Sequence, residues 1–328
     1  MNGQQVVVTG AGGFIGSHLC AELVQRGAQV RAVCRYTSRR DVGDLAALDA
    51  EQRAAIDASF GDVRDGDFVG GVVTGADAVF HLAASISVPY SFEAPREVVM
   101  TNVEGTLNVL QAVRRAEVGR MLQMSSSETY GTAQTVPIDE DHPLGAQSPY
   151  AASKVAGDKL AETFNLTYGL PVVIARPFNT YGPRQSQRAV IPTVVAQALA
   201  GGELQLGALT PTRDFVYVRD TVAALIALVE EPQTSGSTYN IATGVDVSVA
   251  EIVRLVGELL NRELTVSGAQ EERMRPPRSE VHRLLGDATR LRETTGWEPR
   301  TSLREGLAQV IEWMTKIDAT RRSGAYTV

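Results

Sequence analysis

The stretch that decides the fold is Gln5-Val6-Val7-Val8-Thr9-Gly10-Ala11-Gly12-Gly13-Phe14-Ile15-Gly16. An apolar run typical of a buried strand leads into glycines at positions 10, 13 and 16, and a helical pattern follows. Glycine permits a tight turn and lets the backbone approach a pyrophosphate, while the start of the helix offers N–H groups and the positive end of its dipole. The stretch therefore predicts a dinucleotide-binding turn. The residues expected to contact the cofactor there are Gly10, Gly13, Phe14, Ile15 and Gly16.

Strand-like apolar runs alternate with helical patterns through the first half of the chain. The expected strands are Gln5–Thr9, Gln29–Cys34, Ala55–Phe60, Ala78–Leu82, Arg120–Ser125 and Pro171–Arg176. The expected helices are Ile15–Arg26, Arg96–Glu117 and Pro149–Tyr168. This alternation predicts an α/β protein of the Rossmann type, with a doubly wound parallel sheet covered by helices on both faces. Because the glycine-rich turn lies at the first βα turn of such a series, it is strong evidence for a dinucleotide-binding site.

The pattern changes after Arg176. Loops rich in Gly, Pro and Arg then alternate with helical stretches at Ala189–Ala200, Arg219–Glu230, Val249–Leu260 and Leu303–Met314. We expect residues 1–177 to form a dinucleotide-binding domain and residues 178–328 to form mainly a smaller, mixed C-terminal substrate domain. Because 238–241 is strand-like, residues 215–245 are expected to return to the main sheet.

The composition excludes several classes of function. The 328 residues carry a formal net charge of −7, with a pI near 5.3, so no basic surface for nucleic acid or for a membrane is expected. No apolar run reaches the ~18 residues of a membrane span, and no charged leader precedes the first strand, so a cytoplasmic protein is expected. Two cysteines, Cys20 and Cys34, and four histidines without ligand spacing predict neither a disulfide framework nor a metal site.

The end of the second strand bears on the choice of cofactor. An acidic residue at this position would bond the ribose 2′-hydroxyl of NAD, but the chain has Cys34-Arg35-Tyr36-Thr37-Ser38-Arg39-Arg40. Arginines match a 2′-phosphate well, so NADP is favoured, with contacts from Arg35, Ser38 and Arg39, or Arg40 in place of Arg39. The alternative is that these arginines lie on a solvated loop and NAD binds through its 2′-hydroxyl.

The ends of the third and fourth strands are expected to complete the cofactor site. Asp62 and Val63 follow the third strand, where the carboxylate of Asp62 would face the adenine amine. Leu82, Ala83 and Ala84 end the fourth strand, where small residues let a cofactor lie across the sheet. The alternative for both groups is that they serve only packing and turns.

Tyr150 and Lys154 are the first candidate catalytic pair. Their spacing of four residues puts them on one helix face. A tyrosine that acts as a base at neutral pH needs its pKa lowered by about 3 units. A neighbouring ammonium and the positive nicotinamide would stabilise the phenolate and so lower this pKa, and Lys154 would also bond the nicotinamide ribose.

A hydroxyl-rich segment with a carboxylate follows the fifth strand as Ser125-Ser126-Ser127-Glu128. The carboxyl ends of parallel strands are where such sheets bind ligands. We expect the Ser126 hydroxyl to bond the substrate oxygen that Tyr150 deprotonates. The alternative for Glu128 is a carboxylate that only starts a helix or lies in a loop.

Taken together, these motifs identify the chain as similar to the extended short-chain dehydrogenase/reductase family of nucleotide-sugar enzymes. The resemblance extends over nearly the whole chain, and the segments that carry it are Gly10–Gly16, His81–Ala84, Thr101–Thr106, Tyr150 with Lys154, Arg176–Arg184, Arg213–Asp220 and Gly296–Pro299.

The resemblance also suggests a reaction. The family's 4-epimerases commonly carry a Ser-Ser-Ala-like triplet where this chain has Ser126-Ser127-Glu128, whereas its 4,6-dehydratases carry Thr-Asp-Glu or Thr-Ser-Glu. Glu128 therefore resembles the dehydratase base. The resemblance is closest to GDP- or UDP-sugar 4,6-dehydratases, with residues 132–138 and 185–192 similar to a GDP- or UDP-N-acetylglucosamine dehydratase-like branch. The Cys34-Arg35 strand end is similar to that of NADP-using GDP-mannose 4,6-dehydratases. Two departures are that Ser126 replaces the usual Thr, and that Ser127 replaces the Asp of the dTDP-glucose type, so that a separate acid for the leaving group is missing.

The implied reaction is a nucleotide-diphosphate-sugar 4,6-dehydration. It comprises oxidation at C4, removal of the C5 proton by Glu128, loss of water from C6 and return of the hydride. Catalysis would use Ser126, Ser127, Glu128, Tyr150 and Lys154. By the same resemblance, the substrate residues would be Ser87, Asn179, Arg188, Arg213 and Arg275.

Other functions stay open at this point. The alternatives within the family are a 4-epimerase, a hexuronate decarboxylase and an enzyme that stops at a 5,6-ene. The triplet of the decarboxylases is also Thr-Ser-Glu-like. A dinucleotide-sensing regulator is an alternative outside catalysis, although Ser126, Tyr150 and Lys154 argue against it. The resemblance further implies a homodimer formed by the helices at 96–117 and 149–168, whose apolar faces would otherwise belong to the core.

Overall fold

The structure is a computed structural model that describes residues 1–269, 281 and 283–322. Seven strands form a large sheet in the order β10-β6-β5-β4-β1-β2-β3, and all neighbours are parallel. The strands are β1 Gln5–Thr9, β2 Gln29–Arg35, β3 Ile56–Gly61, β4 Ala78–His81, β5 Arg120–Met124, β6 Val172–Pro177 and β10 Thr238–Ile241. The doubly wound α/β class is thus confirmed, and the strands expected from the first half agree with the observed ones to within one residue at each end.

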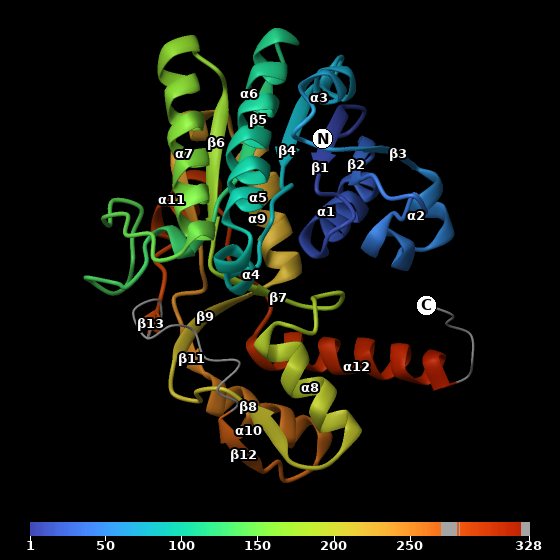
Figure 1. Ribbon diagram of the computed structural model, residues 1–328, viewed down its shortest axis with the longest axis vertical. Helices are drawn as coiled ribbons and strands as arrows, with labels where there is room; N and C mark the ends of the chain where they lie inside the picture. Colours follow the sequence, from blue (N-terminus) through green and yellow to red (C-terminus); the bar gives the residue numbers. More distant parts are fainter. Residues whose placement is uncertain (270–280, 282, 323–328) are drawn as a thin grey trace.

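Helices cover both faces of this sheet (Figure 1). One face carries α1 (Phe14–Gln25), α9 (Val218–Glu230) and α11 (Thr289–Thr295), and the other carries α3 (Gly66–Val73), α6 (Gly105–Arg115) and α7 (Pro149–Tyr168). The shorter helical segments are η1 Gly43–Ala47, α2 Ala50–Ala54, α4 Val88–Glu93, α5 Pro95–Val99, η3 Ser127–Thr129 and η4 Pro232–Thr234.

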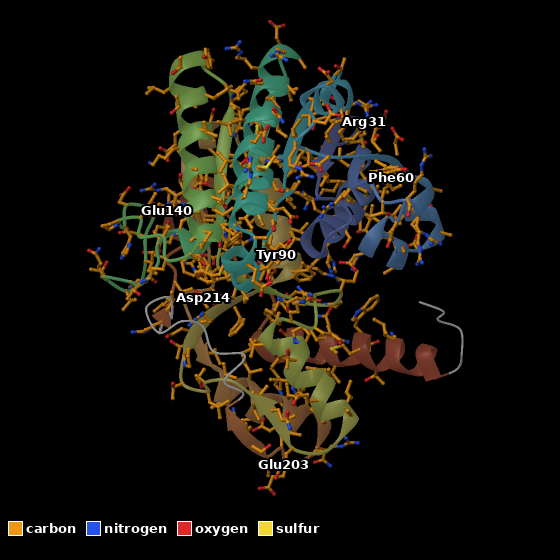
Figure 2. The ribbon with its side chains drawn as sticks, in the orientation of Figure 1. Arg31, Phe60, Tyr90, Glu140, Glu203 and Asp214 are labelled. Atoms are coloured by element: carbon orange, nitrogen blue, oxygen red, sulfur yellow. The ribbon has the colours of Figure 1, made fainter. Side chains whose placement is uncertain are left out.

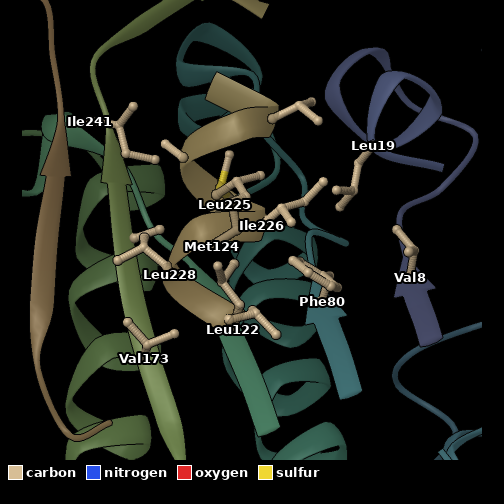
Figure 3. Packing of buried hydrophobic residues seen from close by; sticks show 14 of the residues in the cluster. Val8, Leu19, Phe80, Leu122, Met124, Val173, Leu225, Ile226, Leu228 and Ile241 are labelled. Atoms are coloured by element: carbon tan, nitrogen blue, oxygen red, sulfur yellow. The ribbon is translucent and has the colours of Figure 1, made fainter. Parts of the chain in front are cut away.

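The core follows from strands that are apolar on both faces. Along β1, Val6 and Val8 face α1 and α9, whereas Val7 faces the opposite helices. Figure 3 shows the first of these clusters, in which Phe80 and Leu122 of the sheet pack against Leu225 and Ile226 of α9. The helix α9 therefore covers the centre of the sheet although it comes late in the chain.

The expected helix Arg96–Glu117 is present as a continuous helical run over 95–115, but it contains a π-helical segment that the sequence did not predict. The structure has α5, then a π-helical segment at Met100–Glu104, and then α6. The π-helical segment places Asn102 so that its amide binds two distant groups: Nδ2 donates to Ser153 Oγ at 2.9 Å, and Oδ1 accepts from the Ser85 N–H at 2.7 Å. Segments of this kind are frequent at functional sites, and here the segment anchors the chain after β4 against α7.

The smaller part of the molecule lies beyond the carboxyl ends of the strands (Figure 1). It contains a four-stranded sheet of β7 (Asn179–Tyr181), β9 (Thr212–Tyr217), β11 (Asp246–Ser248) and β13 (Arg283–Leu284), and a two-stranded sheet of β8 (Leu204–Leu206) and β12 (Val266–Ala269). Its helices are α8 (Val190–Ala200), α10 (Val249–Leu260) and α12 (Leu303–Arg322). The expected end of the last helix at Met314 is therefore eight residues short, because its final turns are polar and carry no apolar periodicity.

The segment 215–245 contributes to both parts. Its α9 packs on β5 and β6, and β10 pairs with β6 in the large sheet. Its first residues instead belong to β9, which pairs with β7 and β11. In the part of the chain that the structure describes, no helix is long and apolar enough to cross a membrane.

Candidate active site

The glycine-rich turn has the shape that a dinucleotide requires. Gly10 has φ +71°, and a Cβ there would lie 2.8 Å from the Ala83 nitrogen. A Cβ on Gly16 would collide with the Gly10 carbonyl oxygen. The helix α1 starts at Phe14 after Gly13, and no side chain caps it. The N–H groups of its first turn therefore have no capping side chain, an arrangement that suits a bound anion.

The end of β4 forms a second wall beside this turn. Thr9 Oγ1 lies 2.7 Å from His81 Nδ1 and accepts from the Ala83 N–H at 3.2 Å. His81 Nε2 lies 3.1 Å from Thr106 Oγ1. Burial, with a smaller effect of Lys154, lowers the pKa of His81 to about 3, so the ring is neutral at pH 7. Leu82, Ala83 and Ala84 are thus held next to Gly10 by groups on three elements.

The adenine end of the predicted site is more crowded with charge than the sequence suggested. Asp62 is bound by Arg64, whose Nη2 lies 2.5 Å from Asp62 Oδ2, and this hydrogen bond is the main reason that the Asp62 pKa is lowered. Val63, the next residue, is buried and packs in the core cluster under α3 and α6. The Asp62 carboxylate thus already has an arginine partner, which the sequence reasoning did not anticipate.

Arg35 ends β2 with its side chain 73% exposed and its Nη2 4.0 Å from Glu97 Oε1. The Tyr90 hydroxyl donates to Glu97 Oε2 at 2.5 Å, and Figure 2 shows Tyr90 on the side of the large sheet's helices that faces the smaller part. Ser38 and Arg39 are exposed on the loop after β2. Sequence reasoning missed Glu97, which stands beside the proposed phosphate-binding arginine.

Tyr150 and Lys154 are both buried in the first turns of α7, and Ser148 caps this helix by accepting the Ala151 N–H at 3.0 Å. Lys154 Nζ donates to the Met124 carbonyl, the last of β5, at 2.6 Å. Burial lowers the pKa of Lys154 to about 8, and Asp158 opposes this effect.

The pKa of Tyr150 does not fall as the sequence argument expected for the folded site. Burial raises it to about 12, a hydrogen bond with Ser126 lowers it, and Glu128 and Asp158 raise it. The protein alone therefore keeps the phenol protonated at pH 7, because desolvation outweighs the favourable contacts.

The short helix η3 brings the other catalytic candidates to Tyr150. Ser126 is the N-cap of this helix, and its hydroxyl accepts the Glu128 N–H at 3.2 Å. Ser127 is buried, whereas Ser126 and Glu128 are half-buried. Since Glu128 acts electrostatically on Tyr150, the structure places a carboxylate, a hydroxyl and a phenol together at the carboxyl end of β5.

The predicted substrate residues lie on several elements around this cluster. Ser87 caps α4 by accepting the Tyr90 N–H at 3.3 Å, and α4 packs against α7. Asn179 is half-buried at the start of β7, directly after β6, and Arg188 is exposed in the loop before α8. Arg275 lies outside the residues that the structure describes.

Arg213 is half-buried on β9 and donates to the Thr212 carbonyl at 2.9 Å. Its neighbour Asp214 is fully buried, and its carboxylate accepts the N–H groups of Thr243 and Gly244, each at 2.9 Å. Asp214 lies between the large sheet and the smaller part (Figure 2), so the backbone that carries Arg213 is held at this junction. Among the described residues, no group of three or more His, Cys, Asp or Glu side chains is arranged to hold a metal ion.

The chain is similar over most of its length to proteins of known activity. The family model described as GDP-mannose 4,6 dehydratase matches residues 7–310. A dTDP-glucose 4,6-dehydratase of Xanthomonas campestris pv. campestris is 33% identical over 94% of this chain and 92% of its own length. A UDP-glucose 4-epimerase of Mycolicibacterium smegmatis is 34% identical over 94% and 98%, and a UDP-N-acetyl-alpha-D-glucosaminuronate decarboxylase of Bacillus cytotoxicus is 33% identical over 96% and 99%.

A solved structure is similar over the same length. The dTDP-glucose 4,6-dehydratase from Streptomyces venezuelae, crystallised with NAD bound, superimposes with a TM-score of 0.85 at 30% identity, covering 96% of this chain and 98% of that one. The relatives thus share a fold and a class of substrate, while their reactions differ.

Proposed function

Because this chain belongs to the GDP-mannose 4,6-dehydratase family of extended short-chain dehydrogenases/reductases, we propose that it is a nucleotide-diphosphate-sugar 4,6-dehydratase. The family includes dehydratases, epimerases and decarboxylases that act on nucleotide sugars. The observation that favours the dehydratase is the position of Glu128, whose carboxylate acts on Tyr150 from a turn that Ser126 caps. A carboxylate at this place is a base for the carbon next to the oxidised one.

The residues around the glycine-rich turn fit a nicotinamide dinucleotide. Gly10 and Gly16 let the turn pack tightly, because a Cβ at either position would collide with backbone atoms of the turn itself or of the end of β4, and the uncapped start of α1 suits a pyrophosphate. The proposed cofactor contacts are those expected from the sequence. They lie in the glycine-rich turn and at the ends of β2, β3 and β4, and Tyr150 and Lys154 complete them. When bound, the oxidised nicotinamide accepts a hydride from C4 and later returns it, and its positive charge favours the phenolate of Tyr150.

NADP is proposed as the cofactor, with NAD as the alternative. In support, Arg35 and Arg39 are exposed where a 2′-phosphate would lie, and no carboxylate of β2 takes the place that a 2′-hydroxyl needs. Glu97 beside Arg35 supports NAD instead, because its carboxylate is an acceptor for a 2′-hydroxyl near the same position.

The side chains then divide the reaction between them. Tyr150 takes the proton of the C4 hydroxyl, and the Ser126 hydroxyl holds that oxygen by a hydrogen bond. Lys154, as an ammonium, stabilises the phenolate and bonds the nicotinamide ribose. Glu128 removes the C5 proton, which the C4 ketone makes acidic. Water leaves from C6 with a proton from Glu128 or from a water held by the serines, since Ser127 provides no carboxylic acid.

Replacing Glu128 tests this assignment directly. Glu128→Gln removes the base but keeps the size and the capped turn, so we expect rapid formation of reduced cofactor without loss of water from the sugar. Stopped-flow absorbance measures the reduced cofactor, and mass spectrometry measures the product. The exposed Glu93→Gln on α4 is the matched control and should dehydrate at the wild-type rate. Full dehydration by Glu128→Gln would overturn the assigned role.

Products separate the competing reactions within the family. A panel of GDP-, UDP- and dTDP-hexoses and their hexuronates is incubated with the enzyme, and the mass of each product is measured by mass spectrometry. Loss of the mass of one water indicates a dehydratase, loss of carbon dioxide a decarboxylase, and an unchanged mass with a new sugar configuration an epimerase. A 5,6-ene gives the mass of the dehydratase product but has a vinylic proton signal in NMR.

A homodimer through α5, α6 and α7 is also proposed. Leu166 and Tyr168 on α7 are 87% and 52% exposed, and Val99 and Met100 are exposed at the junction with the π-helical segment. A second copy that packs these helices against its own would bury the exposed apolar side chains. Sedimentation velocity should give a dimer for the wild type and a monomer for Leu166→Glu, and a monomeric wild type would contradict the proposal.

A further inference from the structure

A carboxylate that the proposed reaction does not use lies directly behind the catalytic pair. Asp158 follows Lys154 by one turn of α7, and its side chain is completely buried. Its Oδ2 accepts three hydrogen bonds, one from Ser125 Oγ at 2.8 Å and two from the Arg176 guanidinium, Nε at 3.1 Å and Nη2 at 2.9 Å. Its Oδ1 is buried and bonded to nothing in the part of the chain that the structure describes.

These contacts join three elements at the point where catalysis is proposed. Ser125 is the residue before Ser126, and its N–H donates to the Ala175 carbonyl of β6 at 2.7 Å. Lys154 bonds the carbonyl of Met124, the residue before Ser125. The end of β5 is therefore tied to α7 at two successive residues, once through Lys154 and once through Asp158. Loss of the second tie would remove one of the contacts that hold the segment carrying the Ser126 hydroxyl.

Asp158 also sets the electrostatic surroundings of Lys154. The ammonium is buried, which disfavours its charge, and Asp158 is the group that opposes this effect. His81 on β4 is also buried and is a neutral ring on which Lys154 acts electrostatically. Two further charged groups belong to the same cluster: Arg176 on β6 pairs with Asp158, and Glu128 on η3 acts on Tyr150. A buried ammonium without a nearby anion releases its proton more easily.

We propose that Asp158 is a positioning residue of this active site, whose carboxylate clamps the end of β5 to α7 and keeps Lys154 in its charged form beside Tyr150. This inference rests on the catalytic roles proposed for Tyr150 and Lys154. The competing explanation is that Asp158 and Arg176 form a buried ion pair that matters only for stability.

The composition of the chain makes a direct test possible. It contains only three lysines, Lys154, Lys159 and Lys316, so protein grown on lysine labelled with ¹³C at the ε carbon gives three resolved NMR signals. Lys159 and Lys316 have side chains 59% and 71% exposed and are internal controls. In the wild type, the Lys154 signal should titrate near pH 8. The full chain is titrated alone and saturated with NADP.

The variants separate charge from packing. In Asp158→Asn the midpoint of the Lys154 titration should fall by about one unit or more, while Asp158→Glu, which keeps the charge, should restore it toward wild type. Asp158→Asn leaves the Arg176 guanidinium buried without its anion, which can unfold the protein. The double variant Asp158→Asn/Arg176→Gln therefore removes both charges. Its Lys154 midpoint should fall by the same amount. Circular dichroism confirms that each variant is folded.

Ser125→Ala tests the clamp without changing any charge. The Lys154 titration should stay at the wild-type midpoint, while kcat on a nucleotide sugar that the wild type converts should fall about tenfold with little change in the binding of NADP. For Asp158→Asn, the whole pH profile of kcat should move to lower pH, because the carboxylate also raises the pKa of Tyr150, and KM should stay unchanged.

Two outcomes would overturn the inference. If Lys154 titrates at the same pH in the wild type and in the folded double variant, Asp158 does not maintain its charge. If Ser125→Ala has wild-type kcat, the hydrogen bond to Asp158 does not position the strand end. Failure of the proposed function is a separate result: the NMR titration needs no substrate, so a shifted Lys154 in a protein that converts no nucleotide sugar would remove the reaction and leave the electrostatic role of Asp158 in place.

Discussion

The Ser126 hydroxyl accepts the backbone N–H of Glu128 at 3.2 Å, and the same hydroxyl is the hydrogen-bond partner of Tyr150. One side chain therefore holds the turn that carries the proposed C5 base and also contacts the proposed C4 base. The two proton transfers of the reaction occur on adjacent carbons, so the two bases have to be kept at a fixed separation. Ser126 provides this coupling through a single oxygen atom.

Removal of this oxygen should impair both proton transfers. Ser126→Ala loses the cap of η3 and the hydrogen bond to the substrate oxygen, and we expect kcat to fall about a hundredfold. The bond from Ser126 lowers the pKa of Tyr150, so that pKa should rise and the acid limb of the pH–kcat profile should move to higher pH. Ser126→Thr keeps a hydroxyl and should retain most activity. An unchanged acid limb in Ser126→Ala would contradict this argument.

Replacement of Arg35 should change the choice between the two cofactors. A charge-assisted bond to a 2′-phosphate contributes roughly 1.5–3 kcal/mol, so Arg35→Ala should weaken the binding of NADPH by about ten- to hundredfold and leave that of NADH nearly unaltered. Titration of the nicotinamide fluorescence measures both dissociation constants. Arg53→Ala, an exposed arginine on α2, is the control. Equal losses for NADPH and NADH would indicate that Arg35 does not meet the phosphate.

The glycine-rich turn should tolerate no side chain at Gly10. Alanine would have to adopt φ +71° and would bring its Cβ within 2.8 Å of the Ala83 nitrogen. We expect Gly10→Ala to lower the melting temperature and to raise the dissociation constant of the cofactor more than tenfold. Gly70 lies inside α3, and a Cβ added there would meet nothing within 4 Å. Gly70→Ala should therefore bind the cofactor normally and gain about 0.5–1 kcal/mol in stability.

Acid should destabilise the protein through its buried histidine. The pKa of His81 is about 3 in the folded state, below the value near 6.5 of an unfolded chain. The unfolded state therefore binds a proton between these values and the folded state does not, so stability falls as the pH drops below about 6.5. For His81 this amounts to about 2 kcal/mol between pH 7 and pH 5.

Urea unfolding at the two pH values measures this difference. His81→Gln is expected to be less stable at pH 7, because it changes the bonds to Thr9 and Thr106. Its loss between pH 7 and pH 5 should nevertheless be about 2 kcal/mol smaller than that of the wild type. An identical loss in both proteins would show that His81 becomes protonated in the folded state at moderate acidity.

Much of the fold could be predicted because its signals are local. The strands of the large sheet are short apolar runs, the glycines at the first turn have one backbone explanation, and the end of α7 coincides with Gly169 in the left-handed conformation. The π-helical segment could not be predicted in this way. It depends on the bonds of Asn102 to Ser85 and Ser153, which are 17 and 51 residues away.

The candidate site was predictable in its members and less so in its electrostatics. Tyr150, Ser126 and Glu128 were placed together by the order of strands, because the carboxyl ends of parallel strands lie at one edge. The raised pKa of Tyr150 depends on how deeply the side chain is buried, and the arginine bound to Asp62 depends on side-chain conformations. Neither property can be predicted from the spacing of residues. The position of the Asp158 carboxylate behind Lys154 cannot be predicted in this way either.

The position of β10 has a consequence for synthesis of the protein. Thr238–Ile241 is the outermost strand beside β6, so a chain emerging from the ribosome leaves β6 as an open edge until nearly three quarters of its length has been made. Open edges of this kind recruit other strands. Fragments that stop near residue 177 should therefore accumulate in inclusion bodies, whereas fragments that extend past α9 and β10 should be recovered in the supernatant.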